Sequence, residues 1–323
     1  MRRLHVVLLV ALWSGVAIPG YAQEAPRPPL VGVMMTGGAA NTPVPKALRE
    51  ELAARGDVED RNLRLAFRFA DGDARRFPAM AEALVREKAS VIVVFSEAAA
   101  HAAEDATRTI PIVAVAEDLV AAGLGASLAK PGGNITGVSM ISAALDAKRL
   151  EILHEMLPAA RRLAVLSDRT VVSPGRLQLE KDAARELGVE LRIVEIDGPN
   201  DLDTAFETLR AGGAEAVNIV NTSMMFNLRD RLGALASVHR LPAMCGLPEM
   251  AAAGCLAGYG VAARQLYADV ADLTHNMLMG ASPADTPARQ PTTFELVINR
   301  NTARALGVEI PPSLLARANE VIE

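Results

Sequence analysis

Several polar residues stand directly after short apolar runs of this chain, where they could bind a small molecule. Thr36 and Gly37 follow one run, Ser96 and Glu97 follow another, and Asp118 follows a third. If these runs are parallel strands, their carboxyl ends share one edge of a sheet, where helix N-termini present free N–H groups. An amino acid could then place its carboxylate against Thr36 or Ser96 and its ammonium group against Asp118.

The second half of the chain, with the junction before it, offers a matching set of positions. Its members follow apolar runs or lie beside the expected junction of the two halves: Ser139, Asn221, Ser223, Glu249 and Tyr259. Tyr259 is one of few aromatic residues outside an apolar run, since aromatic residues make up only 3% of the sequence. Together with the first-half residues, these form the predicted ligand-binding set.

Several of these positions also have a purely structural explanation. Ser96 and Asn221 are residue types that cap the N-terminus of a helix, and Asp118 could cap a helix that begins at Leu119. Glu97 could be a first-turn acid that the helix dipole favours. The residue types therefore allow either role.

The motifs of common exported or nucleotide-using enzymes are missing from the sequence. Gly137-Val138-Ser139-Met140 lacks the closing glycine of a Gly-x-Ser-x-Gly nucleophile elbow, and no Gly-x-x-x-x-Gly-Lys-Ser/Thr loop occurs. Beyond His5, the histidines are scattered over separate expected helices. We therefore expect no enzyme activity, no catalytic residue, no cofactor and no metal site. An exported α/β hydrolase is the less favoured alternative.

Short Val- and Ile-rich runs alternate with amphipathic stretches along the chain. Continuous apolar runs, instead of strict alternation, indicate strands covered on both faces, as in a parallel sheet. We expect strands at 30–35, 63–69, 90–95, 112–116, 162–166, 190–195, 216–220, 243–245 and 293–299. We expect helices at 45–55, 77–88, 97–107, 176–187, 202–211, 228–239 and 264–278.

The strand–helix series begins again near residue 162, which indicates two similar halves. Residues 89–96 and 214–221 each read as a strand that ends on a polar residue. The predicted fold is α/β, with two doubly wound parallel-sheet lobes joined by a hinge. We place lobe 1 at 28–139, with 264–290 returning to it, lobe 2 at 140–263, and a hinge-crossing tail at 291–323. Several chain crossings would let the lobes close on a ligand.

The first 22 residues have the order of a secretory signal peptide. Arg2 and Arg3 precede an apolar run from Val6 to Ile18, and small residues flank Tyr21. Cleavage near Ala22 would release a soluble periplasmic protein. Its formal net charge would change from −5 to −7, because two arginines and no acids are removed. That balance provides no basic surface for nucleic acid or anionic lipid.

Two cysteines would remain in the secreted chain, Cys245 and Cys255. An oxidising periplasm permits a disulfide. However, Cys245 is expected at the C-terminal end of one strand and Cys255 at the start of the next, and in a parallel sheet these positions lie at opposite edges. The spacing therefore argues against a bridge, and no histidine or further cysteine stands nearby at metal-ligand spacing.

Several segments match a known family, above all Lys130-Pro131-Gly132-Gly133-Asn134-Ile135-Thr136-Gly137, Lys148-Arg149-Leu150-Glu151 and Phe294-Glu295-Leu296-Val297-Ile298-Asn299. On these segments the chain resembles the ABC transporter substrate-binding family that includes the bacterial tryptophan- and tyrosine-binding proteins. The resemblance covers essentially all of the mature chain. It implies a type I periplasmic binding fold, a small-molecule ligand in the interlobe cleft and delivery to an ABC permease in the inner membrane. In the resembled family, the position that matches Asp118 lies in the cleft.

Other functions of a two-lobed binding protein involve a different partner from a permease. The protein could present its solute to a membrane sensor instead of a permease. A LacI-like repressor shares the fold but needs an N-terminal helix-turn-helix, where this chain has the signal-peptide pattern. We expect a monomer, because one molecule must present both lobes to a permease. With few aromatic side chains to stack a ring, a small aliphatic or amide-bearing zwitterion is as reasonable a ligand as an aromatic amino acid.

Overall fold

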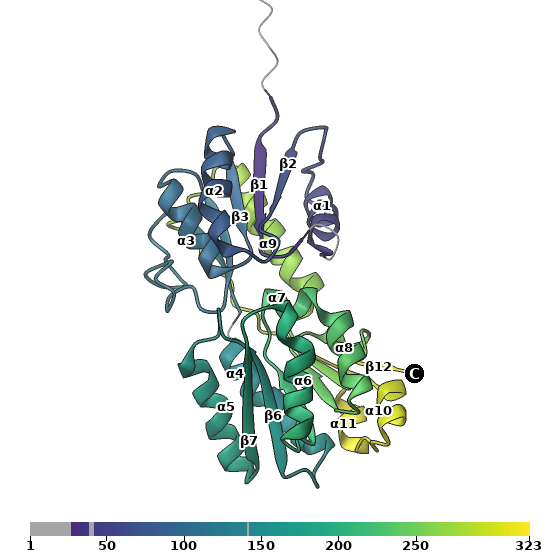
Figure 1. Ribbon diagram of the computed structural model, residues 1–323. Helices are drawn as coiled ribbons and strands as arrows, with labels where there is room; N and C mark the ends of the chain where they lie inside the picture. The colour runs from purple at the N-terminus through teal and green to yellow at the C-terminus, as the bar shows by residue number, and fades with distance from the viewer. Residues whose placement is uncertain (1–26, 39–41, 141) are drawn as a thin grey trace, which may run out of the picture.

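The computed structural model describes residues 27–38, 42–140 and 142–323 and divides them between two sheets, each covered by helices (Figure 1). We call the unit around the first sheet the first lobe and the unit around the second sheet the second lobe. In Figure 1 the first lobe, drawn mostly in purple and blue, lies above the green and yellow second lobe.

The first sheet has five strands within the described residues, all parallel, in the order β2-β1-β3-β4-β5. The strands are β1 (Leu30–Met35), β2 (Arg64–Phe69), β3 (Val91–Val94), β4 (Ile112–Ala116) and β5 (Ile135–Ser139). The helices packed on this sheet are α1 (Val44–Ala54), α2 (Phe77–Arg86), α3 (Glu97–Ala106) and α9 (Ala263–Leu278).

The second sheet has seven strands in the described part of the chain, in the order β12-β11-β10-β9-β8-β6-β7. The strands are β6 (Arg162–Asp168), β7 (Glu190–Ile196), β8 (Ala216–Ile219), β9 (Ala243–Cys245), β10 (Ala257–Gly260), β11 (Glu295–Asn299) and β12 (Glu320–Ile322). The helices of this lobe are α4 (Ser142–Met156), α5 (Pro174–Leu187), α6 (Leu202–Ala211), α7 (Ser223–Asn227), α8 (Arg229–Val238), α10 (Arg300–Leu306) and α11 (Pro312–Arg317).

Both sheets follow the same winding. The orders β2-β1-β3-β4-β5 and β7-β6-β8-β9-β10 each place the second strand on one side of the first and the later strands on the other side. The prediction of an α/β fold with two doubly wound lobes is therefore confirmed. The strand expected at 293–299 is β11, and it runs antiparallel to β10. Strand β12, which was not expected from the sequence, pairs with β11 at the edge of the sheet.

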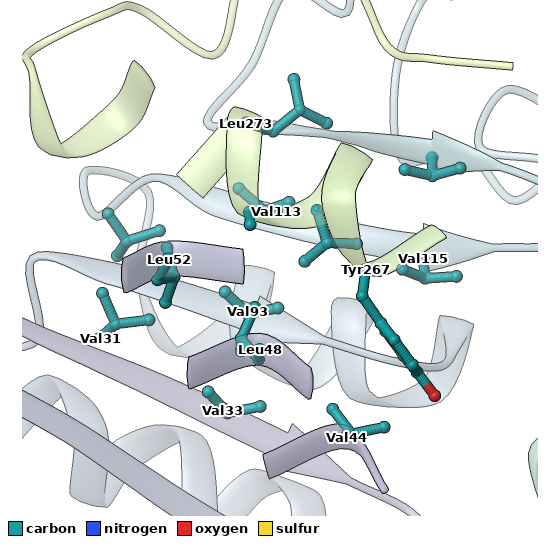
Figure 2. Close-up of a cluster of buried hydrophobic side chains, with 14 of the residues drawn as sticks. Val31, Val33, Val44, Leu48, Leu52, Val93, Val113, Val115, Tyr267 and Leu273 are labelled. Carbon is teal, nitrogen blue, oxygen red and sulfur yellow. The ribbon is translucent and has the colours of Figure 1, made fainter. Parts of the chain in front are cut away.

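Both faces of the first sheet are buried, which explains its continuous apolar strands. Val31 and Val33 of β1 enter the cluster that contains Tyr267 of α9 and the buried side chains of α1 (Figure 2). Leu30 and Met34, one residue out of phase, enter the cluster on the opposite face with α2 and α3. Alternate residues of one strand thus fill two separate cores.

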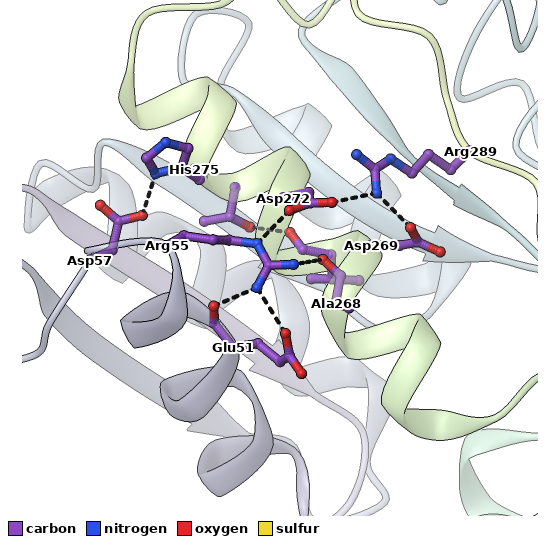
Figure 3. A network of polar contacts seen from close by, with 10 residues as sticks. Glu51, Arg55, Asp57, Ala268, Asp269, Asp272, His275 and Arg289 are labelled. Atoms are coloured by element: carbon purple, nitrogen blue, oxygen red, sulfur yellow. Dashed lines mark hydrogen bonds and ion pairs between the residues drawn. The ribbon is translucent and has the colours of Figure 1, made fainter.

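Helix α9 lies in sequence between β10 and β11 of the second lobe but packs on the first lobe. Arg55, just after α1, pairs with Asp272 of α9 and donates to the backbone oxygen of Ala268 at 3.0 Å (Figure 3). Arg289 pairs with Asp269 and, at 2.8 Å, with Asp272. These ion pairs join α1, α9 and the segment after α9 into one unit.

The Pro-Gly-Gly-Asn-Ile-Thr-Gly segment is a structural junction between distant parts of the first lobe. The Asn134 side-chain amide donates to the backbone oxygens of Thr107 and Ile110 at 3.0 and 2.9 Å. The Thr136 hydroxyl donates to the backbone oxygen of Thr286 at 2.9 Å, in the segment that follows α9. The motif therefore attaches the returning chain to the sheet.

Gly137 of this motif lies so close to β4 that no side chain fits. A Cβ at Gly137 would stand 1.8 Å from the backbone oxygen of Ala114. We expect Gly137→Ala to push β5 from β4 and lower the free energy of unfolding by about 2–3 kcal/mol, measured by urea denaturation. Gly133→Ala is the matched control, because nothing lies within 4 Å of a Cβ at Gly133. Equal unfolding midpoints for the two variants would contradict this role of Gly137.

Cys245 and Cys255 form a disulfide, so the expectation that the spacing argues against a bridge is wrong. Cys245 ends β9, and Cys255 precedes β10, which runs parallel to β9. Strand β9 has only three residues, so its two ends are about 7 Å apart. The two Cα atoms lie 6.3 Å apart, within the range of a disulfide. Two cysteines at opposite ends of neighbouring parallel strands are too far apart for a disulfide only when the strands are longer than the three residues of β9.

Candidate functional site

The segments after the strands of the two lobes touch each other at their carboxyl ends. Ser223 begins α7 after β8, and its hydroxyl donates to the backbone oxygen of Phe95, after β3, at 3.1 Å. Gly37, after β1, lies against Asn227 at the end of α7, because a Cβ on Gly37 would stand 2.3 Å from the Asn227 amide nitrogen. A contact between charged groups lies nearby, where Nη1 of Arg176 in α5 is 3.0 Å from Oε2 of Glu117, which follows β4.

These contacts lie near the points where the strand order of each sheet reverses. In the first sheet that point is between β1 and β3, and in the second it is between β6 and β8. Open α/β sheets bind ligands outside the carboxyl ends of their strands at such points. Thr36 and Ser96 follow the first pair of strands, and Asn221 closely follows β8.

The predicted first-lobe residues differ in what their side chains do. Ser96 caps α3 by accepting a hydrogen bond from the Ala99 N–H at 3.2 Å, and Glu97 is in the first turn of the same helix. Asp118 is exposed and accepts the N–H groups of Val120 and Ala121 at 2.9 and 3.0 Å. Ser96 and Asp118 therefore act as capping residues, and Glu97 is a first-turn acid, as the structural explanation of these positions predicted.

Thr36, Gly37 and Ser139 are placed differently. The Thr36 hydroxyl oxygen is buried and forms no hydrogen bond with any residue that the structure describes. Gly37 contacts the second lobe through Asn227. Ser139 is buried, and its hydroxyl is 3.5 Å from the backbone oxygen of Glu117. Thr36 is thus the first-lobe residue whose polar group is left available.

The predicted second-lobe residues fall into two groups. Asn221 and Ser223 lie at the face that meets the first lobe. Glu249 accepts the Ala263 N–H at 2.7 Å, where the chain leaves β10 for α9. The ring of Tyr259 packs against Phe294, with centroids 6.3 Å apart, and joins the second-lobe core. Glu249 thus stabilises the crossing between β10 and α9, and Tyr259 contributes to the second-lobe core.

The sequence analysis missed a buried charge cluster in the second lobe. Asp146 of α4 is fully buried and accepts hydrogen bonds from Arg149 and Arg176. Arg149 also donates to the backbone oxygens of Gly246 and Tyr259 at 2.8 and 2.6 Å. One carboxylate and two guanidinium groups therefore hold α4, α5 and the ends of β9 and β10 together.

One signal in the sequence could have identified this cluster. Arg176 is in the first turn of α5, after the N-cap Ser173 and Pro174, where the helix dipole disfavours a cation. Burial alone would lower the pKa of Arg176, but the carboxylates of Asp146 and Glu117 outweigh burial and raise it. A cation at a helix N-terminus indicates acidic partners from elsewhere in the fold.

Glu180 of α5 completes the cluster as a protonated acid. Burial, with the charge of Asp146, raises the pKa of Glu180 to about 8. Glu180 Oε2 accepts a hydrogen bond from the Asn218 amide at 2.7 Å, whereas Glu180 Oε1 and Asn218 Oδ1 have no hydrogen bond within the described ranges. A proton on Glu180 adds a donor to this pair. It also leaves two cations, Arg149 and Arg176, facing the two anions Asp146 and Glu117.

The raised pKa of Glu180 makes stability depend on pH. From pH 4.5, the usual pKa, to about pH 8, the folded protein holds a proton that the unfolded chain has lost. Stability therefore decreases as the pH rises through this window. Glu180→Gln keeps the shape without ionising, so we expect its Tm to fall less than the wild-type Tm between pH 5 and 8.5, as followed by circular dichroism.

The control for this prediction is Glu186→Gln, which removes an exposed carboxylate from the same helix. We expect the Tm of this variant to follow the wild-type pH dependence. If Glu180→Gln also ran parallel to the wild type, Glu180 would be ionised in the folded protein.

No metal centre or membrane span occurs among the residues that the structure describes. No group of three or more His, Cys, Asp and Glu side chains there is placed to hold a metal ion. No helix in those ranges is both long and apolar enough to cross a bilayer.

Two matched α/β lobes whose strand ends face each other define the class of bilobed solute-binding proteins. The family model described as ABC transporter substrate binding protein matches residues 35–322. The chain belongs to this family. The family is one of solute-binding proteins, which confirms the expectation that the chain is not an enzyme.

Known relatives share the fold over most of the chain. A tyrosine-binding protein of Clostridioides difficile is 26% identical over 267 residues, which are 82% of this chain and 76% of that protein. A conserved domain protein of Vibrio cholerae has a TM-score of 0.82 at 25% identity, covering 91% of this chain and 99% of its own. An ABC domain of Streptococcus pneumoniae in complex with L-Trp has a TM-score of 0.81 at 22% identity, with 91% and 100% coverage.

Proposed function

We propose that this protein captures a small zwitterionic solute, an amino acid or a close relative, between its lobes for an ABC importer. The observation that carries this proposal is the direct contact of the two strand-end faces, where Ser223 of the second lobe reaches Phe95 of the first. A solute bound there contacts both lobes and is enclosed when they close.

The polar groups near the contact suit such a solute. The Thr36 hydroxyl, which has no hydrogen-bond partner among the described residues, can bind a carboxylate or an amide. The N-terminus of α3 beside Ser96 favours a negative group. Glu97 and Asp118 carry the negative charge that attracts an ammonium group. We therefore retain Thr36, Gly37, Ser96, Glu97, Asp118, Ser139, Asn221 and Ser223 as the proposed site, with Glu249 and Tyr259 as its less direct members.

The relatives support an amino acid as the ligand class. One is named as a tyrosine-binding protein and another was solved with L-Trp. Only 3% of the residues in this chain are aromatic, however, so a smaller side chain is as suitable as an aromatic one.

The proposed setting of the protein is the periplasm. The signal-peptide pattern of residues 1–22 lies outside the described residues and stays a prediction, as does cleavage near Ala22. We propose that the mature chain is a monomer that delivers its solute to an inner-membrane permease. We also propose boundaries of 28–139 with 264–290 for lobe 1, 140–263 for lobe 2 and 291–323 for the tail that crosses the hinge.

Calorimetric titration of the mature chain with the twenty amino acids, together with native mass spectrometry of the purified protein, tests the ligand class. We expect at least one amino acid to bind with micromolar or tighter affinity, which is about −8 kcal/mol. Retention of an uncharged sugar, with no binding across the panel, would contradict the proposal.

Thr36→Val tests the proposed site itself, because it replaces the buried unpaired hydroxyl with a methyl group of similar size. We expect an amino acid found in the titration to bind about fivefold more weakly, the effect of one lost hydrogen bond, with little change in Tm. Thr204→Val, on the exposed face of α6, is the control that should leave affinity unchanged. Unaltered binding by Thr36→Val would remove Thr36 from the site.

A further inference from the structure

We propose that the Glu117–Arg176 ion pair is a latch that forms when the lobes close and strengthens solute binding without touching the solute. This inference rests on the proposed function. Glu117 follows the first-lobe strand β4, and Arg176 is in the second-lobe helix α5, with Nη1 and Oε2 3.0 Å apart. Because the two charges belong to different lobes, any opening of the lobes separates them.

Arg176 is fixed in place by its own lobe. Its Nε donates to the fully buried Asp146, and its Nη2 donates to the backbone oxygen of Asn221 at 3.0 Å. The Arg176 side chain is only 6% exposed. These bonds fix the guanidinium with Nη1 3.0 Å from Oε2 of Glu117, so Arg176 is held in place for that partner before the lobes meet.

Glu117 is the more accessible member, and its partner comes from across the interface. Its side chain is 35% exposed, and its backbone oxygen lies 3.5 Å from the hydroxyl of Ser139, where the chain leaves the first lobe. Opening would separate the Glu117 carboxylate from Nη1 of Arg176, while Arg176 would keep Asp146 and Asn221. The free energy of the pair therefore favours the closed form specifically.

The pair differs from the other contacts between the lobes. Ser223 donates a single hydrogen bond to the Phe95 backbone oxygen, and Gly37 only packs against Asn227. An ion pair with one buried partner has the larger electrostatic attraction, because the surrounding dielectric constant is lower than in water. We therefore assign the largest single contribution to closure to Glu117 and Arg176.

Glu117→Gln is the main test variant, because it removes the charge and leaves the Arg176 bonds within the second lobe intact. We expect solute affinity to fall about tenfold, mostly through faster dissociation, and the loss to shrink at high salt. Glu87→Gln is the matched control, since Glu87 pairs with Arg68 inside the first lobe at 2.6 Å. That variant should bind within about twofold of the wild type.

Glu117→Lys provides a readout that requires no solute. Two like charges at the contact repel each other, so we expect a larger radius of gyration for the solute-free protein in small-angle X-ray scattering. An unchanged radius for Glu117→Lys would overturn the latch even if the protein binds no amino acid at all. The scattering experiment thus tests the latch independently of whether the protein binds an amino acid.

Ligand analogues separate a latch from a direct contact with the solute. Loss of a latch lowers affinity by the same factor for an amino acid and for its des-amino carboxylic acid, because both require the same closure. If Glu117→Gln weakened only the amino acid, Glu117 would instead bind the ammonium group, and the latch would be wrong. Affinity unchanged for both compounds would also overturn it.

Discussion

The buried carboxylate of Asp146 is the interaction on which the second-lobe face depends. It binds two guanidinium groups, and these hold backbone oxygens of Asn221, Gly246 and Tyr259. Those oxygens lie in or just after β8, β9 and β10, so one anion fixes the positions of several strand ends at once. A buried ion cluster of this kind contributes more to a defined geometry than to stability, because desolvation offsets much of its attraction.

In the first lobe, a glycine and contacts to backbone oxygens fix the positions of the strands and of the returning segment. The chain must return from the second lobe and add α9 to the first sheet, and this requires close approach at several points. Gly137 allows β5 to lie against β4, while Thr136 and Arg289 fix the returning segment. The family motif at residues 131–137 is thus explained by the connection between lobes, and a ligand is not needed to account for it.

Much of the fold could be predicted from apolar periodicity, because strands buried on both faces form continuous runs such as Val91–Val94. The bounds of helix α4 could not be predicted, because its buried positions include Asp146 and Arg149, residue types that are usually exposed. The Cys245–Cys255 disulfide could not be predicted, because its formation depends on the short length of β9, which brings the two strand ends close together. Site residues such as Ser96 could be located at strand ends, but only the packed structure separates a capping hydroxyl from the unpaired one of Thr36.

Closure by a bilobed binding protein requires a balance that these contacts satisfy. If contacts between the lobes were extensive, the molecule would stay closed without solute and could neither bind nor release it. A ligand shifts the equilibrium only by the difference in its affinity for the two forms. The Glu117–Arg176 ion pair, the Ser223 hydrogen bond and the packing of Gly37 are each modest. They bias the solute-free molecule toward the closed form enough to add to affinity, and the solute completes the closure.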